Sequence, residues 1–504
     1  MKKLSIIFAL LFITFLTVVS LKPRKLNERI KLTNIDYSSH LQVPEGFSSF
    51  ALDMGQVLGG KWWEGSLSFE GGRGGVKTTP FDFNRGELDY LIKPLAPFTL
   101  RLGGSEADSV LYSIQSNRSV LTIDETEKGF QTILTKERVG AIKRFIDQND
   151  LDLMFTLNIG PGYRANGKLD YKKIEDFLSS LSVEIPNIKT FELGNEINAF
   201  FLNYGPGGQV FMKEYVENYL KVKKLVRKYF PDAKLAGPAN AFWPYIGEVF
   251  SSFTLNSQKL MEQLKDALDI YSWHYYPTQS IRCPVQLEPS TEKNMLDSIF
   301  YNDYFSQSES IIQQAKKFNI GSVWLGESGP AQCGGQPQVS KSIESSLWYY
   351  DHLFKTLRTG QKKLIRQTLV GSDYGLINDK DLSVNFDYYV ARLFKYLNPK
   401  LIFKTQEPLV HSFCDAKGTL YHSFVSGESR TIVVPEEGYE LASFGEKRFL
   451  NFTPDEFDSQ VEMAFREVSG KYKVLTNTVN ILRTKASKSE CVDHLGELHR
   501  EVLP

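Results

Sequence analysis

The sequence predicts an α/β protein: a (β/α)8 TIM barrel followed by a C-terminal β-sandwich accessory domain. Short apolar runs of β-type composition alternate with amphipathic helical stretches from about residue 47 to about residue 400. This alternation is typical of a parallel sheet with crossover helices. Eight candidate strands fall in the span, which is the number that closes a barrel. After residue 400 short β-like runs continue without long helices between them.

The predicted barrel strands are short, and most are followed by Gly, Asn, Asp or Glu and then a loop. They are Phe47–Asp53, Phe98–Leu102, Leu153–Leu157, Thr190–Leu193, Ala233–Gly237, Ile270–His274, Ser322–Leu325 and Arg366–Val370. A doubly wound open sheet is the main alternative, and such a sheet more often carries a glycine-rich phosphate loop. Residues 71–75 are glycine-rich but lack the spacing of the dinucleotide or P-loop motifs, so the barrel is favoured.

Apolar residues recur at helical spacing between these strands. The clearest predicted helices are Lys172–Leu181, Phe211–Phe230, Ile343–Leu357 and Tyr388–Leu397. We therefore assign residues 47–400 to a catalytic barrel and residues 401–504 to the β-sandwich. Its predicted strands are Leu401–Phe403, Leu420–Phe424, Arg430–Val434 and Tyr472–Leu475. Residues 21–46 form an N-terminal segment that could add a strand to the β-sandwich.

The first 20 residues read as a secretory signal peptide. Lys2 and Lys3 precede an apolar run that extends to Val19, and Ser20 is small enough for a cleavage site. The run has about 16 residues and a membrane span needs about 20, so an uncleaved anchor is the less favoured alternative. We expect a secreted or otherwise extracytoplasmic protein, whether extracellular, lysosomal or periplasmic.

The charge balance limits the partners. Lys and Arg together number 59, as do Asp and Glu, so the net charge is zero. Nucleic acid is excluded as the main partner because a basic footprint is missing, and a highly sulfated substrate is disfavoured for the same reason. No other segment is long and apolar enough to suggest a transmembrane partner. We expect a monomer.

The four cysteines fit an oxidising compartment. Cys283, Cys333, Cys414 and Cys491 show no metal-binding spacing, so we interpret them as disulfides, for which three pairings exist. Cys414 and Cys491 lie near the two ends of the β region. A bridge between them would leave Cys283 to pair with Cys333 between two barrel loops.

Two glutamates stand just past apolar runs, where a barrel carries its catalytic groups. Glu196 follows the fourth predicted strand and Glu327 follows the seventh. Barrel closure would bring them face to face, and glycosidic cleavage with retention of configuration requires two carboxyl groups about 5–5.5 Å apart. One lone glutamate at a strand end would more often be a surface or ion-pair residue, but the pair favours catalysis. We predict Glu196 as the general acid/base and Glu327 as the nucleophile.

The two glutamates need different surroundings. Glu196 must hold a proton at the working pH, whereas Glu327 must be ionised and therefore needs hydrogen-bond donors. We expect Tyr275, at the end of the sixth strand, to hold Glu327 through its hydroxyl, and Asn195 to bind the 2-hydroxyl of the sugar. Glu192 lies within the fourth strand and is interpreted as structural.

Several motifs together resemble the heparanase family of glycoside hydrolases, family 79. They are Glu192–Glu196, Trp324–Glu327, Leu102–Ser105, Trp273–Tyr276 and the run from Asp387 to Lys395. The Asn-Glu pair alone is shared by a whole clan of barrel glycosidases. The similarity runs from about residue 47 to residue 400 and continues weakly beyond, where a Cys414–Cys491 pair resembles the family's accessory-domain bridge.

The resemblance implies a barrel with a β-sandwich, cleavage at a β-linked glucuronic acid, and no metal or organic cofactor. It carries the catalytic roles onto Glu196 and Glu327. The residues that it places in the sugar site are Asp53, Gly104, Ser105, Asn195, His274, Tyr275, Gly334, Gly335 and Tyr374. The backbone amides of Gly334 and Gly335 would receive the uronate carboxylate, since glycine permits close approach; a simple turn is the alternative reading of this pair.

The sequence also departs from the animal heparanases, which are strongly basic. The loop Ala239–Pro244 holds no arginine or lysine that could bind a sulfate, and Arg282 and Lys61 cannot be placed from sequence. An exo-β-glucuronidase, or an endo-enzyme for a less sulfated polymer, therefore rivals heparan sulfate cleavage. A barrel glycosidase for neutral β-glycosides and a non-catalytic carbohydrate-binding protein are the further alternatives.

Overall fold

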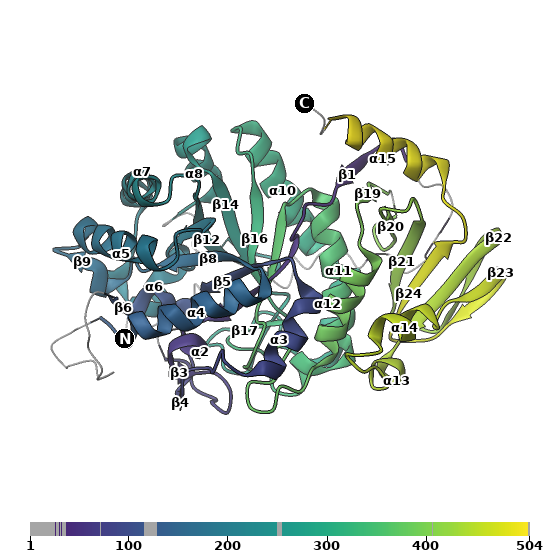
Figure 1. The fold of residues 1–504 in the computed structure, drawn as a ribbon, viewed down its shortest axis with the longest axis horizontal. Helices are drawn as coiled ribbons and strands as arrows, with labels where there is room; N and C mark the ends of the chain where they lie inside the picture. Colours follow the sequence, from purple (N-terminus) through teal and green to yellow (C-terminus); the bar gives the residue numbers. More distant parts are fainter. Residues whose placement is uncertain are drawn as a thin grey trace, which may run out of the picture.

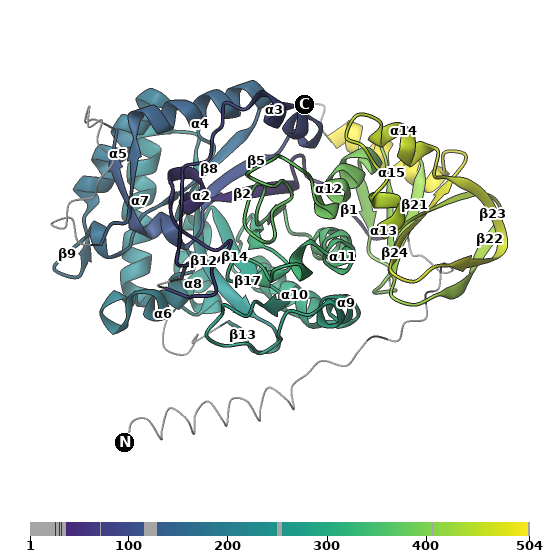
Figure 2. The same cartoon turned by 90° about the horizontal axis from the view of Figure 1, so that it is seen from below.

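The predicted barrel is present. The computed structural model describes residues 26, 30, 32 and 37–501, except 71, 115–128, 249–254 and 406, so the predicted signal peptide lies outside the described residues. Eight parallel strands form a closed ring because β11 pairs with both β8 and β12 (Figure 2). In order around the ring they are β2 (Ser48–Asp53), β5 (Thr99–Gly103), β8 (Asp152–Leu157), β11 (Thr190–Leu193), β12 (Lys234–Trp243), β14 (Ile270–Tyr275), β16 (Val323–Ser328) and β18 (Lys363–Arg366).

Seven of the eight strands lie where the sequence predicts them, and the eighth was predicted too late in the chain. The expected strand was Arg366–Val370, whereas β18 is Lys363–Arg366. Lys363, at the start of β18, is buried although it carries a basic side chain. Its Nζ donates to Thr99 Oγ1 at 2.8 Å and to the Gly46 carbonyl at 3.0 Å, and these bonds satisfy the ammonium group inside the barrel.

Helices surround the barrel (Figure 1). In α7 the buried side chains include Tyr215, Tyr219, Val222 and Val226, the face that the sequence predicts. The main barrel helices are α3 (Gly86–Ile92), α4 (Lys136–Asn149), α5 (Tyr171–Glu184), α7 (Met212–Tyr229), α8 (Ser257–Leu264), α9 (Glu292–Phe300), α10 (Asp303–Lys317), α11 (Ile343–Thr359) and α12 (Phe386–Leu397).

The C-terminal region forms one seven-stranded antiparallel sheet with the order β1-β19-β20-β21-β24-β22-β23. The first of these strands comes from the N-terminal segment, since His40 pairs with Phe403. The strands are β1 (His40–Gln42), β19 (Leu401–Phe403), β20 (His411–Cys414), β21 (Leu420–Ser426), β22 (Arg430–Phe444), β23 (Arg466–Val474) and β24 (Thr478–Thr484). The expectation of a purely β region was wrong, because it also holds helices α13 (Glu446–Phe449), α14 (Phe457–Glu462) and α15 (Ser489–Glu501).

The sheet packs on the barrel through α11, which lies between them in Figure 1. Nearly every residue of α11 is buried, so this helix has no solvent face. Side chains alternate along the sheet strands: Tyr421 and Val425 join the main core with the barrel, while Phe424 joins a separate small cluster on the opposite face. The barrel and the sheet therefore share one hydrophobic core.

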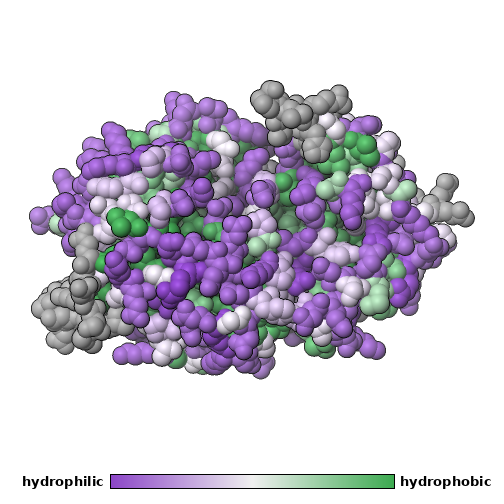
Figure 3. Space-filling model, in the orientation of Figure 1, coloured by the Kyte–Doolittle hydropathy of each residue, from purple (hydrophilic) through white to green (hydrophobic). Residues whose placement is uncertain are grey.

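The four cysteines form two disulfides, Cys283–Cys333 and Cys414–Cys491. The second joins β20 to α15 and closes the β region, as the family resemblance suggests. The face in Figure 3 is mostly hydrophilic, with hydrophobic side chains in small, separate patches. Within the described part of the chain, no helix is both long and apolar enough to cross a membrane.

Candidate active site

A cavity opens at the C-terminal ends of the barrel strands, where the predicted site residues gather. Its empty space is about 800 Å³, continuous with solvent. Four carboxylic side chains face it, those of Asp53, Glu106, Glu196 and Glu327, together with aromatic and aliphatic groups. The predicted residues Gly104, Ser105, Gly334 and Tyr374 line it as well.

The two predicted catalytic glutamates face each other. Glu196 follows β11 with a left-handed backbone (φ 49°), and its N–H donates to the Ala239 carbonyl at 3.0 Å, which ties this turn to β12. Glu327 lies within β16. One carboxylate oxygen of each glutamate and a ring nitrogen of His274 all lie within 4.8 Å of one another. The side chain of Glu196 is 18% exposed and that of Glu327 is 8% exposed, so Glu196 is the more open of the two.

Arg101, in β5, is completely buried and contacts both Glu327 and Asn195, the residue before Glu196. Its Nη1 donates to Glu327 Oε2 at 2.6 Å, its Nη2 to Asn195 Oδ1 at 2.8 Å, and its Nε to Glu192 Oε2 at 2.8 Å. Glu192 is also completely buried and accepts a further bond from Thr156 Oγ1 at 2.9 Å. Glu192 thus serves as a countercharge inside the barrel, which agrees with the structural role expected from its place within the strand.

The surroundings of Glu327 favour its ionised form. Burial alone would raise its pKa, but the electrostatic interactions with His274 and Arg101 and the hydrogen bonds from Tyr276 and Arg101 outweigh burial. The pKa of Glu327 is therefore held below its usual value. Tyr276 donates its hydroxyl to Glu327 Oε1 at 2.6 Å.

The donor to Glu327 is Tyr276, so the prediction of Tyr275 in this role was wrong. The hydroxyl of Tyr275 instead donates to Asp303 Oδ2 at 2.8 Å, outside the barrel interior. The reason is strand alternation: successive side chains point to opposite faces, and His274 already points at the two glutamates. Tyr276, two residues further on, shares that face, whereas Tyr275 points towards the surrounding helices.

Two more carboxyl groups lie beside the glutamates. Burial raises the pKa of Glu106 to about 7, and burial together with the charges of Glu106 and Glu327 raises the pKa of Asp53 well above its usual value. Gln367 donates from its side-chain amide to Asp53. Gly104 is left-handed (φ 82°), and a Cβ at this position would overlap Asp53, so only glycine fits here. A carboxyl group that keeps its proton can donate a hydrogen bond to a sugar hydroxyl as well as accept one.

The structure also places the two cations that could not be placed from sequence. Arg282 is buried and donates to the carbonyl of Gly335 at 2.6 Å, so it is committed to the protein itself. Lys61 forms an ion pair with Glu70 near the surface. Neither side chain lines the cavity.

Most predicted sugar-site residues therefore converge, but not all face the open space. Asn195 and His274 are buried and contact Arg101 and Glu196, while Gly335 lies beside Tyr374 just behind the lining. Sequence reasoning missed Arg101, Glu106, Tyr276 and Gln367. Arg101 could have been predicted from the sequence, because a charged side chain between Leu100 and Leu102 in an apolar strand requires a buried partner.

The comparisons with known proteins agree with this geometry. Residues 76–354, more than half of the chain, match the family described as "Glycosyl hydrolase family 79, N-terminal domain". The chain belongs to this family.

Three relatives illustrate the similarity. Heparanase-like protein 3 of Arabidopsis thaliana is 26% identical over 345 residues, which cover 64% of this chain and 60% of the relative. Baicalin-beta-D-glucuronidase of Scutellaria baicalensis is 23% identical, with 64% of each chain covered, and heparanase of Mus musculus is 25% identical, with 62% of each covered. This family 79 chain thus spans about 60% of the length of the curated relatives it matches.

Solved structures show a similar overall fold. The crystal structure of a 4-O-alpha-L-rhamnosyl-beta-D-glucuronidase from Fusarium oxysporum superposes with a TM-score of 0.59 and covers 92% of this chain and 99% of its own, at 12% identity. A GH51 arabinofuranosidase from Xanthomonas axonopodis superposes with a TM-score of 0.55 at 15% identity. At this level of identity the similarity concerns the fold alone.

Glu196, His274 and Glu327 also carry the donor atoms that a metal ion would require at this spacing. The guanidinium of Arg101, 2.6 Å from Glu327, is a fixed positive charge that opposes a cation in the same place. In this family 79 site the three residues therefore suit proton transfer better than metal binding.

Replacing Tyr276 by Phe should lower kcat on a cleaved glycoside by about 10- to 100-fold, the value of one hydrogen bond to a buried charge. Tyr275→Phe is the matched control, because it removes a hydroxyl of the same strand that contacts Asp303. It should change kcat by less than about threefold. Equal losses in the two variants, measured by steady-state kinetics, would contradict the assignment.

Replacing Arg101 by Gln should move the acidic limb of the pH–activity profile to higher pH. Activity needs ionised Glu327, so it is present above the pKa of Glu327 and is lost as pH falls through it. Removing the positive charge raises that pKa, and activity then disappears at a higher pH than in the native enzyme. Arg101→Lys keeps the charge and should stay closer to the native profile. An unchanged acidic limb in folded Arg101→Gln, checked by circular dichroism, would show that Arg101 does not control Glu327.

Proposed function

We propose that this chain is a retaining glycoside hydrolase that cleaves β-linked glucuronic acid by double displacement. The observation that carries the proposal is the spacing of the two glutamates, whose carboxylate oxygens approach within 4.8 Å. Retaining enzymes have carboxyl groups about 5–5.5 Å apart, whereas inverting enzymes need about 6.5–9.5 Å to admit a water molecule. The approach of one carboxylate oxygen of each glutamate to within 4.8 Å of the other supports retention.

Each glutamate has one role in each half of the reaction. Glu196 donates its proton to the glycosidic oxygen while Glu327 attacks the anomeric carbon, so the leaving group departs as an alcohol and a glycosyl ester forms on Glu327. Glu196, now ionised, takes a proton from water, and the hydroxide oxygen displaces Glu327. The greater exposure of Glu196 suits proton exchange with leaving group and water, and the donors around Glu327 suit an ionised nucleophile.

Glucuronic acid is the proposed sugar because a carboxylate-binding element adjoins the nucleophile. Gly334 lines the cavity, Gly335 follows it, and Tyr374 lies against Gly335. Backbone N–H groups and a tyrosine hydroxyl can bind a uronate, whereas a neutral sugar does not need them. The name of one relative, baicalin-beta-D-glucuronidase, also points to glucuronides. A neutral β-glycoside is the alternative substrate class.

The wall near Glu196 suggests the character of the leaving group. It is formed by Ala199, Leu202, Ala241 and Trp243, which follow Glu196 or lie on the adjoining β12. Among the described residues that line the cavity there is no Lys or Arg, while four carboxyl groups are present. A densely sulfated polymer would find no cationic side chain among these residues to bind its sulfate groups. We therefore favour glucuronides with weakly charged or apolar leaving groups over heparan sulfate.

The remaining expectations are part of the same proposal. We propose secretion through a signal peptide at residues 1–20, which the two disulfides favour. We also propose that residues 401–504 act as a β-sandwich accessory domain that braces the barrel, and that the protein works as a monomer. The zero net charge supports a carbohydrate rather than a nucleic-acid partner.

The test is turnover of aryl β-glucuronides by three variants. Glu327→Ala should lower kcat/KM by about four orders of magnitude, and Glu217→Gln, on the exposed face of α7, should leave it unchanged. Glu196→Gln should lose most activity on substrates with poor leaving groups and little on an activated aryl leaving group, because only the former need an acid. Native activity in Glu327→Ala, or equal losses in Glu196→Gln on both substrates, would refute the assigned roles.

A further inference from the structure

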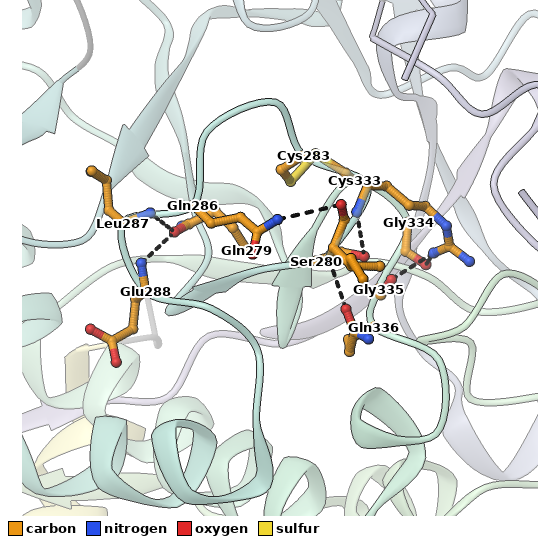
Figure 4. Close-up of a disulfide and its surroundings, with 12 residues drawn as sticks. Gln279, Ser280, Cys283, Gln286, Leu287, Glu288, Cys333, Gly334, Gly335 and Gln336 are labelled. Carbon is orange, nitrogen blue, oxygen red and sulfur yellow. Dashed lines mark hydrogen bonds between the residues drawn. A yellow bond between two sulfur atoms is a disulfide. The ribbon is translucent and has the colours of Figure 1, made fainter. Parts of the chain in front are cut away.

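Two barrel loops are joined beside the proposed uronate site. One follows β14 and contains β15 (Thr278–Gln279) and Cys283; the other follows β16 and contains β17 (Ala331–Gln332) and Cys333. The short strands pair in parallel, and the disulfide connects the loops just beyond them (Figure 4). Gly334 and Gly335 follow Cys333 directly, so the bridge is attached to the glycine pair.

The backbone at this point is unusual. Cys333, Gly334 and Gly335 have φ values of 60°, 78° and 82°, three consecutive residues in the left-handed region. A cysteine rarely adopts this conformation without surrounding structure that imposes it. A Cβ on Gly334 would overlap Trp63, so no side chain at this position can anchor the segment. At Gly334 itself the loop can therefore be held only through its backbone.

Arg282 provides the backbone anchor. Its Nη1 donates to the carbonyl of Gly335 at 2.6 Å and lies 3.5 Å from that of Gly334, while Nε donates to the Ser66 carbonyl at 2.6 Å. Asp373 forms an ion pair with the same guanidinium. Since Asp373 neutralises Arg282, the main effect of Arg282 on the loop is orientation rather than charge.

The fixed carbonyls determine where the amides point. The Gly334 carbonyl also accepts the Ser372 hydroxyl at 2.7 Å, so its direction is doubly set. In a trans peptide the carbonyl and the following N–H point to opposite sides, so the N–H of Gly335 is turned away from Arg282. Gly334 and Cys333 line the cavity and Arg282 does not. The Gly335 N–H thus lies on the side of its peptide opposite Arg282, in a segment whose two preceding residues line the cavity.

We propose that Arg282 and the Cys283–Cys333 disulfide are positioning elements for uronate recognition. Together they hold the Cys333–Gly335 backbone so that its amide meets the sugar carboxylate, and they thereby set the preference for a glucuronide over the corresponding glucoside. The proposal rests on the proposed function, because it assumes that a β-glucuronide is the substrate. It adds Arg282, Cys283 and Cys333 as residues that determine specificity without being catalytic.

The experiment compares kcat/KM on 4-nitrophenyl β-glucuronide and 4-nitrophenyl β-glucoside. Arg282→Met and the double variant Cys283→Ser/Cys333→Ser should each lose about 100-fold on the glucuronide, mainly through KM, because a misplaced binding group has this effect. Their activity on the glucoside should change by less than about threefold. The double variant Cys414→Ser/Cys491→Ser removes the distant bridge and should keep the native ratio of the two substrates.

Ser372→Ala is a milder variant in case Arg282→Met does not fold, and it should shift the ratio in the same direction by about 10-fold. Where glucoside turnover is too slow, the inhibition constants of glucuronate and glucose give the same comparison. Native substrate ratios in the folded Arg282, Cys283/Cys333 and Ser372 variants would overturn the proposal. A native enzyme inactive on the glucuronide would instead overturn the proposed function, so the two failures are distinguishable.

Discussion

The site depends on one buried guanidinium. Arg101 sits inside the barrel with no exposure and joins β5 to β11 and β16 through Glu192, Asn195 and Glu327. A charge without solvent must be paired, and here the pairing fixes the relative position of three strands whose ends carry the chemistry. Asn195 directly precedes Glu196, so the same contact sets the turn that presents Glu196. Both glutamates are thus positioned by a residue that does not reach the cavity.

Three neighbouring carboxyl groups differ in their pKa values. Burial and mutual repulsion raise the pKa of Asp53 and bring that of Glu106 to about 7. Glu327 is also buried, but its interactions with His274 and Arg101 and the hydrogen bond from the Tyr276 hydroxyl keep its pKa below its usual value. The surroundings therefore favour the protonated form of Asp53 and the ionised form of Glu327. When neighbouring carboxyl groups have different pKa values, one can be ionised and act as a nucleophile. Another can keep its proton and donate a hydrogen bond.

The sequence allowed the barrel and its two glutamates to be predicted because both follow from local patterns. Apolar runs such as Leu153–Leu157 read as buried strands, and Glu196 and Glu327 stand directly after such runs. The predictions that were wrong concerned the direction in which a side chain points or its contacts with residues far away in the sequence.

Tyr275 and Tyr276 are adjacent and identical, and only the direction of the His274 side chain decides which of them reaches Glu327. The start of β18 at Lys363 was not predicted, because the ammonium group of Lys363 is satisfied by Thr99 and Gly46, which are far away in the sequence. Arg282 could not be assigned because its partners come from three separate loops.

The central claim is double displacement across the pair formed by Glu196 and Glu327, and its stereochemical outcome tests it most directly. Hydrolysis of an aryl β-glucuronide should be followed by proton NMR from the first seconds, before the released sugar mutarotates. The account predicts that β-glucuronic acid appears first and the α-anomer only later. Initial release of the α-anomer would mean single displacement by water, and would contradict the assignment of Glu327 as a nucleophile.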